Sequence, residues 1–61
     1  MSLHFEDTCN LLRKTERQMF EEAYLYRYGR KASITRDLLT YQFAGILPDY
    51  VKEYLQHVYR R

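Results

Sequence analysis

One proline and two glycines are the only strong backbone punctuation in this 61-residue chain. No sustained alternation of polar and apolar residues, the pattern typical of strands, runs between them. Gly29 has the position of a helix C-cap glycine, and Gly45 and Pro48 indicate the end of one helix and the first turn of the next. The sequence therefore predicts an all-α fold with helices over about residues 3–28, 34–44 and 48–60.

Apolar residues recur at helical spacing in the first and last of these segments. One face of the 3–28 helix carries Phe5, Cys9, Leu12, Met19, Phe20 and Ala23, and the stripe of the 48–60 helix is Leu47, Val51, Tyr54, Leu55 and Val58. Both segments are thus predicted to pack one face against a common core.

The 34–44 helix is apolar on two faces, with Ile34, Leu38 and Tyr41 on one side and Leu39 and Phe43 roughly opposite. A short helix of this kind needs cover on both sides. We therefore expect Leu39 and Phe43 to form the core of a dimer.

The length of the chain also favours self-association. A chain of 61 residues is one domain, and it buries only about 60% of its unfolded surface, so its stability as a monomer is marginal. Cys9 is the single cysteine, which rules out an internal disulfide, and self-association is the remaining common support. The predicted arrangement is a long helix of about 38 Å with two shorter helices folded along it, completed by oligomerisation.

The connection from Gly45 to Pro48 decides between two arrangements. Ile46 and Leu47 lie between the two signals and are both apolar, so we expect this corner to face the core. A shallow bend would lay the last two helices along the first, whereas a steep bend would free the 48–60 helix to bind DNA. The apolar pair favours the tucked-in corner.

Glu16 is a candidate buried carboxylate, since it lies near the middle of the apolar stripe of the 3–28 helix. A buried carboxylate needs a partner, such as Arg36 or a tyrosine hydroxyl, across a dimer interface or within the chain. The alternative is that the helices diverge there and Glu16 reaches solvent.

Seven tyrosines provide the candidate interaction surface together with a run of basic residues. Tyrosine suits interfaces, although small helical cores also use it at their boundaries, and tyrosine with arginine can stack on bases. The predicted surface comprises Tyr24, Tyr26, Arg27, Tyr28, Arg30, Lys31 and Arg36. Ser33 is predicted to be the N-cap of the second helix, and the preceding basic residues make it a minor candidate for phosphorylation.

The alternative function is a helix-turn-helix-like DNA-binding regulator that reads DNA with the 48–60 helix. Its contacts would be Lys52, Gln56, His57 and Arg60. Asp49 and Glu53 on the same face would confront phosphates, and the position near the turn that needs a small residue carries Tyr41, so this alternative is less favoured.

No motif indicates an enzyme, a cofactor or a metal site, because His4, Cys9 and His57 lack ligand spacing and no nucleophile has a base beside it. No apolar run approaches the length of a membrane span. Charge is uneven: residues 1–26 hold three basic and five acidic side chains (net −2) and residues 27–61 hold seven and three (net +4). We expect a cytoplasmic, non-enzymatic interaction, assembly or regulatory module that binds a protein partner and itself.

Overall fold

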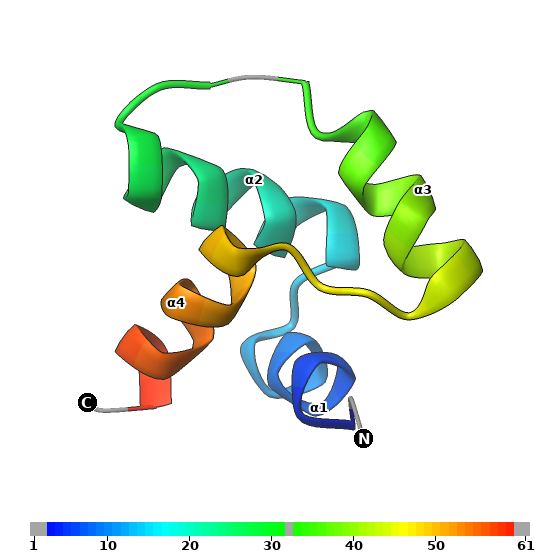
Figure 1. Ribbon diagram of the computed structural model, residues 1–61. Coiled ribbons are helices and arrows are strands. Elements are labelled where there is room, and N and C mark those ends of the chain that lie inside the picture. Colours follow the sequence, from blue (N-terminus) through cyan, green and yellow to red (C-terminus); the bar gives the residue numbers. More distant parts are fainter. Residues whose placement is uncertain (1–2, 32, 60–61) are drawn as a thin grey trace.

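The computed structural model describes residues 3–31 and 33–59, and it is all-helical over those ranges. Its four helices are α1 (Leu3–Leu12), α2 (Glu16–Tyr28), α3 (Thr35–Ala44) and α4 (Asp49–Tyr59). Helix α2 runs through the middle of the molecule, with α4 and α3 on different sides of it and α1 below (Figure 1). The other three helices pack mainly on α2, and α4 does so most extensively.

The predicted long helix over residues 3–28 is wrong, because the chain breaks it at residues 13–15. Arg13 adopts the left-handed conformation with φ of 57°. Its amide donates to the Asn10 carbonyl at 3.1 Å, and the amide of Lys14 donates to the Cys9 carbonyl at 2.9 Å. These two bonds are those of a Schellman C-cap, which usually carries glycine where Arg13 stands. A helix of 38 Å would not fit this molecule, whose longest extent is 27 Å.

Thr15 then starts α2 as its N-cap. Its hydroxyl accepts from the Gln18 amide at 3.1 Å, and the Gln18 side chain accepts from the Thr15 amide at 2.9 Å. This reciprocal pair is a capping box, which satisfies two amides that the helix itself cannot. The restart turns the chain, so α1 and α2 contribute their apolar residues to the core from different directions.

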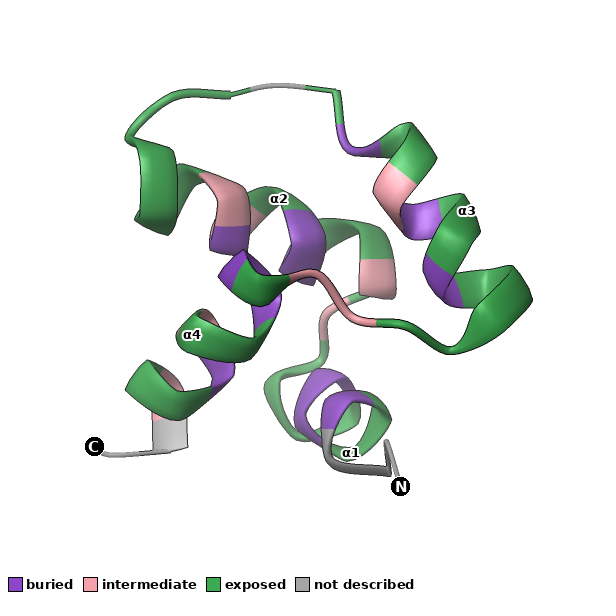
Figure 2. Ribbon diagram, viewed as in Figure 1, coloured by how far each residue is buried: buried purple, intermediate pink, exposed green. Residues whose placement is uncertain are grey.

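The core draws on all four helices and on Ile34 just before α3 (Figure 2). Phe5 and Phe20 are completely buried and meet edge to face with ring centroids 5.6 Å apart. The buried cluster comprises Phe5, Cys9, Met19, Phe20, Ala23, Ile34, Leu38, Tyr41, Tyr50, Val51 and Leu55. Most of the predicted inward positions are therefore confirmed, whereas Leu12, 40% exposed, lies at the break in the helix.

Ser33 is not the N-cap of α3. Ile34 occupies that position and no side chain caps the helix. Ile34 is only 2% exposed, so its burial in the core fixes the start of α3 where a polar cap was expected. Ser33 is exposed in the preceding segment.

The Gly45–Pro48 corner is partly as predicted. Gly45 is left-handed with φ of 69°, and its amide donates to the Tyr41 carbonyl at 2.7 Å, which closes α3. The Pro48 carbonyl accepts from the amides of Val51 and Lys52 at 3.1 Å, which opens α4. Leu47 packs on the core, but Ile46 is 57% exposed, so the expectation that both face inward is wrong for Ile46. The corner carries the chain from one side of α2 to the other (Figure 1).

Candidate interaction surfaces

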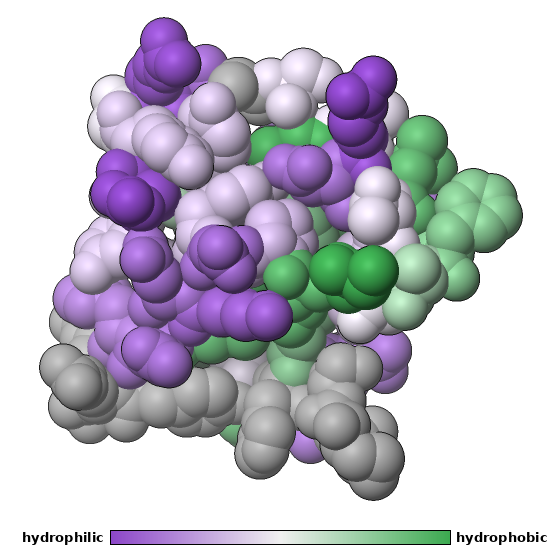
Figure 3. Space-filling model, in the orientation of Figure 1, coloured by the Kyte–Doolittle hydropathy of each residue, from purple (hydrophilic) through white to green (hydrophobic). Residues whose placement is uncertain are grey.

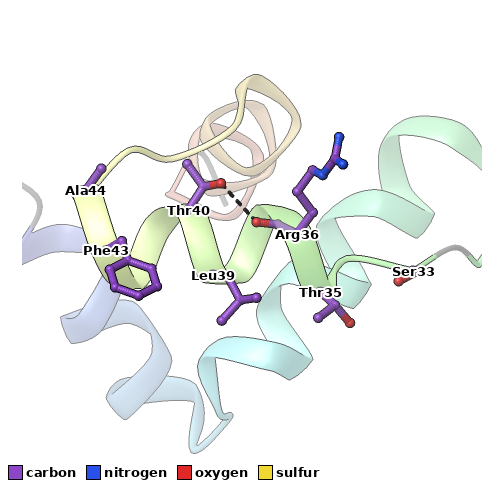
Figure 4. Close-up of a pocket in the computed structure, with 7 residues that line it drawn as sticks. All are labelled: Ser33, Thr35, Arg36, Leu39, Thr40, Phe43 and Ala44. Atoms are coloured by element: carbon purple, nitrogen blue, oxygen red, sulfur yellow. Dashed lines mark hydrogen bonds between the residues drawn. The ribbon is translucent and has the colours of Figure 1, made fainter.

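The outward face of α3 is the most exposed apolar surface of the described chain. Phe43 is 88% exposed and Leu39 is 48% exposed, and both point to the same side of the helix (Figure 4). They line a shallow hollow of about 640 Å³ together with Ser33, Thr35, Arg36, Thr40 and Ala44. In the space-filling view, apolar side chains gather at this edge of the molecule, whereas hydrophilic ones cover the opposite side (Figure 3). The two predicted dimer-core residues therefore lie side by side and uncovered.

Helical geometry explains why this face of α3 is exposed. At 100° per residue, Leu39 and Phe43 are separated by 40°, while Leu38 and Tyr41 project to the opposite side and are buried. Arg36 is the one charged residue of the hollow. The Thr40 hydroxyl donates to the Arg36 carbonyl at 3.0 Å, so this polar group is satisfied within the helix (Figure 4).

A second hollow lies on the other flank of Leu39, where α3 faces the beginning of α2. It measures about 360 Å³ and is lined by Thr15, Glu16, Arg17, Thr35, Leu38, Leu39 and Gln42. Thr35 and Leu39 border both hollows and so form a ridge between them.

Glu16, the predicted buried carboxylate, lies in this second hollow and is half-buried. The break in the first helix places it in the first turn of α2, where a negative charge is favourable, and not within a continuous buried stripe. No hydrogen bond or ion pair engages it among the described residues. Its charge helps to raise the pKa of Cys9 and of Tyr41, although burial is the larger cause for both groups.

The predicted tyrosine and basic surface is divided by the structure. Tyr24 is half-buried and packs edge to face on the buried Tyr50 at 5.3 Å. The ring centroids of Tyr28 and Tyr24 are 4.6 Å apart, and the Arg27 guanidinium lies 5.5 Å from the Tyr28 ring centroid. Arg36 belongs to the hollow on α3. Arg30 and Lys31 are exposed after α2, and Lys31 borders a separate hollow with Glu21, Glu22 and Leu25.

The end of α2 meets α4 at His57, one of the residues proposed to contact DNA, and at Glu53. The Tyr26 ring stacks on the His57 imidazole with centroids 4.7 Å apart, and Arg27 Nε lies 3.0 Å from Glu53 Oε1. Two residues of the predicted tyrosine and basic surface, Tyr26 and Arg27, therefore lie against α4. Lys52, Gln56 and His57 are exposed on α4, and Arg60 lies outside the described residues.

Three part-buried side-chain hydrogen bonds link the helices and the connection between α1 and α2. The Tyr50 hydroxyl donates to Asp37 Oδ2 at 2.6 Å and so links α4 to α3. Burial first, and then this bond, raises the pKa of Tyr50 well above its ordinary range. Glu22 Oε1 accepts from Lys14 Nζ at 2.6 Å and from the Tyr54 hydroxyl at 3.0 Å, and the bond to Glu22 is the main cause of a raised pKa for Lys14.

Neither the capping box nor these long-range bonds were predicted from the sequence. The box is legible in Thr15-Glu16-Arg17-Gln18, a threonine followed three residues later by glutamine. The Tyr50–Asp37 and Tyr54–Glu22 bonds join residues 13 and 32 positions apart in the chain and leave no local signal.

No cluster of three potential metal ligands occurs among the described residues, and no helix there could span a membrane. Burial raises the pKa of the Cys9 thiol to about 11, with smaller contributions from Glu16 and Glu6, so the thiolate is scarce at neutral pH.

The chain matches no protein family model, and no curated protein or solved structure matches it.

Proposed function

We propose that this chain is a small non-enzymatic protein–protein interaction module that self-associates through the outward face of α3. The observation that carries the proposal is the exposure of Phe43, 88%, beside Leu39, 48%, in a hollow with a single charged residue. A large aromatic side chain next to an aliphatic one is the usual composition of an interface anchor.

The thinness of the core supports self-association. Only eleven apolar side chains are buried in the described part of the chain, and a domain of this size has little stability to spare. Burying Phe43 and Leu39 against a second chain would remove further apolar area from water, at about 25 cal/mol per Å². A cytoplasmic location belongs to the same proposal and is supported by the single thiol, which is buried and unpaired.

Sedimentation equilibrium of the wild-type chain and of Phe43→Ser tests the proposal. We expect a dimer mass for wild type at roughly 10–100 µM, a concentration range typical of modest interfaces, and a monomer mass for Phe43→Ser. Leu25→Ser is the matched control, because Leu25 is 45% exposed but lines a different hollow, and it should sediment as wild type does. A wild-type monomer throughout that range, or equal dimerisation of Phe43→Ser, would contradict the proposal.

A DNA-binding regulator remains the alternative function, with α4 as the reading helix. The ion pair between Arg27 and Glu53 neutralises a cation on that surface, and Asp49 adds a further negative charge at the start of α4. We therefore expect no shift of a duplex DNA in a mobility assay at low salt. A steep, salt-sensitive shift that Lys52→Ala weakens would favour DNA binding instead.

A further inference from the structure

The three residues that join α1 to α2 hold a conformation that their sequence does not favour. Arg13 has φ of 57°, in the left-handed region where a residue other than glycine is strained. Residues 13–15 contain neither glycine nor proline, and arginine and lysine are good helix formers. In helical conformation they would place Cys9 and Phe20 only about 20° apart around one continuous helix. The connection can therefore be bent or straight.

Helix α1 is held in the molecule by side chains that it inserts among the other helices. Phe5 is completely buried and Cys9 is 4% exposed. The Phe5 ring meets Phe20 of α2 edge to face with centroids 5.6 Å apart, and it meets Tyr41 of α3 at 5.1 Å. Both partner helices follow α1 in the chain. They form a slot that α1 of a second copy would fit as well as α1 of the same chain does.

A straight connection would move α1 out of its own slot. A continuous helix over residues 3–28 is about 38 Å long, whereas the longest extent of the molecule is 27 Å. Its first part would project beyond the rest of its own chain, with Phe5 and Cys9 uncovered. A second chain in the same state has an empty slot that offers identical contacts, so an exchange of α1 between two chains would restore both cores.

We propose that this chain forms a domain-swapped dimer, in which residues 13–15 join a continuous helix and α1 of each copy occupies the slot of the other. Because the core contacts recur between the chains, the connection decides the balance between monomer and dimer. Straightening it relieves Arg13 and extends the helical hydrogen bonding, and strained short hinges favour such exchange. It gives up the capping box of Thr15 and the Lys14–Glu22 ion pair.

This dimer differs from the proposed α3 dimer in how it forms. It does not need Leu39 or Phe43, and it requires α1 to leave its slot, so protein that stays folded keeps the bent connection. Refolding from urea at about 1 mM should produce the swapped dimer, because that concentration approaches the effective concentration of a segment on a short tether. Once formed, the swapped dimer should persist on dilution until it is unfolded again.

Substitutions in the connection shift this balance in opposite directions. They are made in the Phe43→Ser background, which removes the proposed α3 contact, and the dimer fraction is measured by light scattering after refolding and dilution. Arg13→Gly relieves the bent form, so the dimer fraction should fall about tenfold or more. Arg13→Ala combined with Thr15→Ala favours the straight form and should raise it severalfold. Arg17→Ala, at an exposed position that is helical in both forms, is the matched control and should change nothing.

Isotope-filtered NMR identifies the contacts of the dimer. In a dimer refolded from equal parts of labelled and unlabelled chains, nuclear Overhauser effects between Phe5 and Phe20 should join a labelled ring to an unlabelled one. Circular dichroism verifies that each variant is helical, and Arg13→Gly together with the parent protein completes the comparison without the double alanine variant.

Cross-chain effects between Phe5 and Phe20, with a lower dimer fraction for Arg13→Gly, support the exchange. A dimer in which these effects stay within one chain would overturn the exchange and leave self-association through α3 standing. Monomers alone after refolding at that concentration would also overturn the exchange. The α3 contact is then decided separately by sedimentation of wild type that was never unfolded.

Discussion

Tyr50 shows how a single residue joins elements that are distant in the sequence. Its ring is buried between Phe20 and Tyr24, with edge contacts at 6.5 and 5.3 Å, while its hydroxyl bonds Asp37 on α3. Tyrosine combines a large apolar area with a polar end that needs a partner when buried. The seven tyrosines therefore serve unequal purposes, and Tyr50 belongs to the core.

Removing the Tyr50 hydroxyl should destabilise the fold by about 1–2 kcal/mol, because the charged acceptor Asp37, in a half-buried site, loses the hydrogen bond that Tyr50 donates. Urea unfolding of Tyr50→Phe followed by circular dichroism measures this loss. Tyr28→Phe is the control, since Tyr28 is 51% exposed, and its effect should stay within about 0.5 kcal/mol. Equal stabilities for the two variants would show that the Asp37 bond contributes nothing.

Cys9 should make the free energy of unfolding fall at alkaline pH. Its pKa is about 11 in the fold against an ordinary 9.0, so the folded state favours the protonated thiol. The corresponding stability is fully present below pH 9 and is lost as the pH rises from there towards 11, because the unfolded chain releases its proton first. The loss is on the order of 2 kcal/mol.

Cys9→Ala should remove that part of the decline. Urea unfolding at intervals between pH 8 and 11 should show a shallower fall for the variant, whatever its stability at pH 8. Tyrosines titrate in the same range in both proteins and cancel in the comparison, except for the small part of the raised Tyr41 pKa that is due to Cys9. Parallel curves would exclude Cys9 as the source.

At the scale of elements, the sequence predicts well which segments are helical and less well where each helix begins and ends. Gly29 and Gly45 end α2 and α3 as expected, because a left-handed residue after a helix is ordinarily glycine. Arg13 makes the same turn without glycine, so the break after α1 has no conspicuous signal. The continuous apolar stripe masked it, since Cys9 and Phe20 lie only about 20° apart on an unbroken helix and are also buried in two separate ones.

The two N-termini give opposite expectations for two similar side chains. Thr15→Ala should lower the stability of the fold by about 1 kcal/mol, because the α2 capping box is lost. Thr15→Ser should retain most of this stability, because serine also supplies a capping hydroxyl. Ser33→Ala should change stability by less than about 0.5 kcal/mol, since Ser33 does not cap α3. Thermal unfolding of the three variants checks this order. A larger loss from Ser33→Ala than from Thr15→Ala would contradict the capping assignment.

At the scale of the molecule, the core could be predicted and the arrangement could not. Helical periodicity identified Phe5, Phe20 and Val51 as inward-facing, because burial follows the apolar stripe. The four-helix array within 27 × 26 × 19 Å depends on the turn at Arg13. The stacking of Tyr26 on His57 also depends on how α2 and α4 pack. Leu39 and Phe43 were identified because their exposure follows from the wheel of one helix alone.

If the α3 face closes a dimer, the melting temperature must depend on concentration. Binding that occurs only in the folded state stabilises it by mass action, so a hundredfold dilution of a dimeric protein lowers its stability by about 2.7 kcal/mol. For a domain of this size that corresponds to roughly 10 °C or more. Wild type should show this shift in circular dichroism melts over such a range, whereas Phe43→Ser should melt at one temperature throughout. Identical, concentration-independent melts for both would show that the monomer alone carries the fold and that the exposed α3 face contributes nothing to its stability.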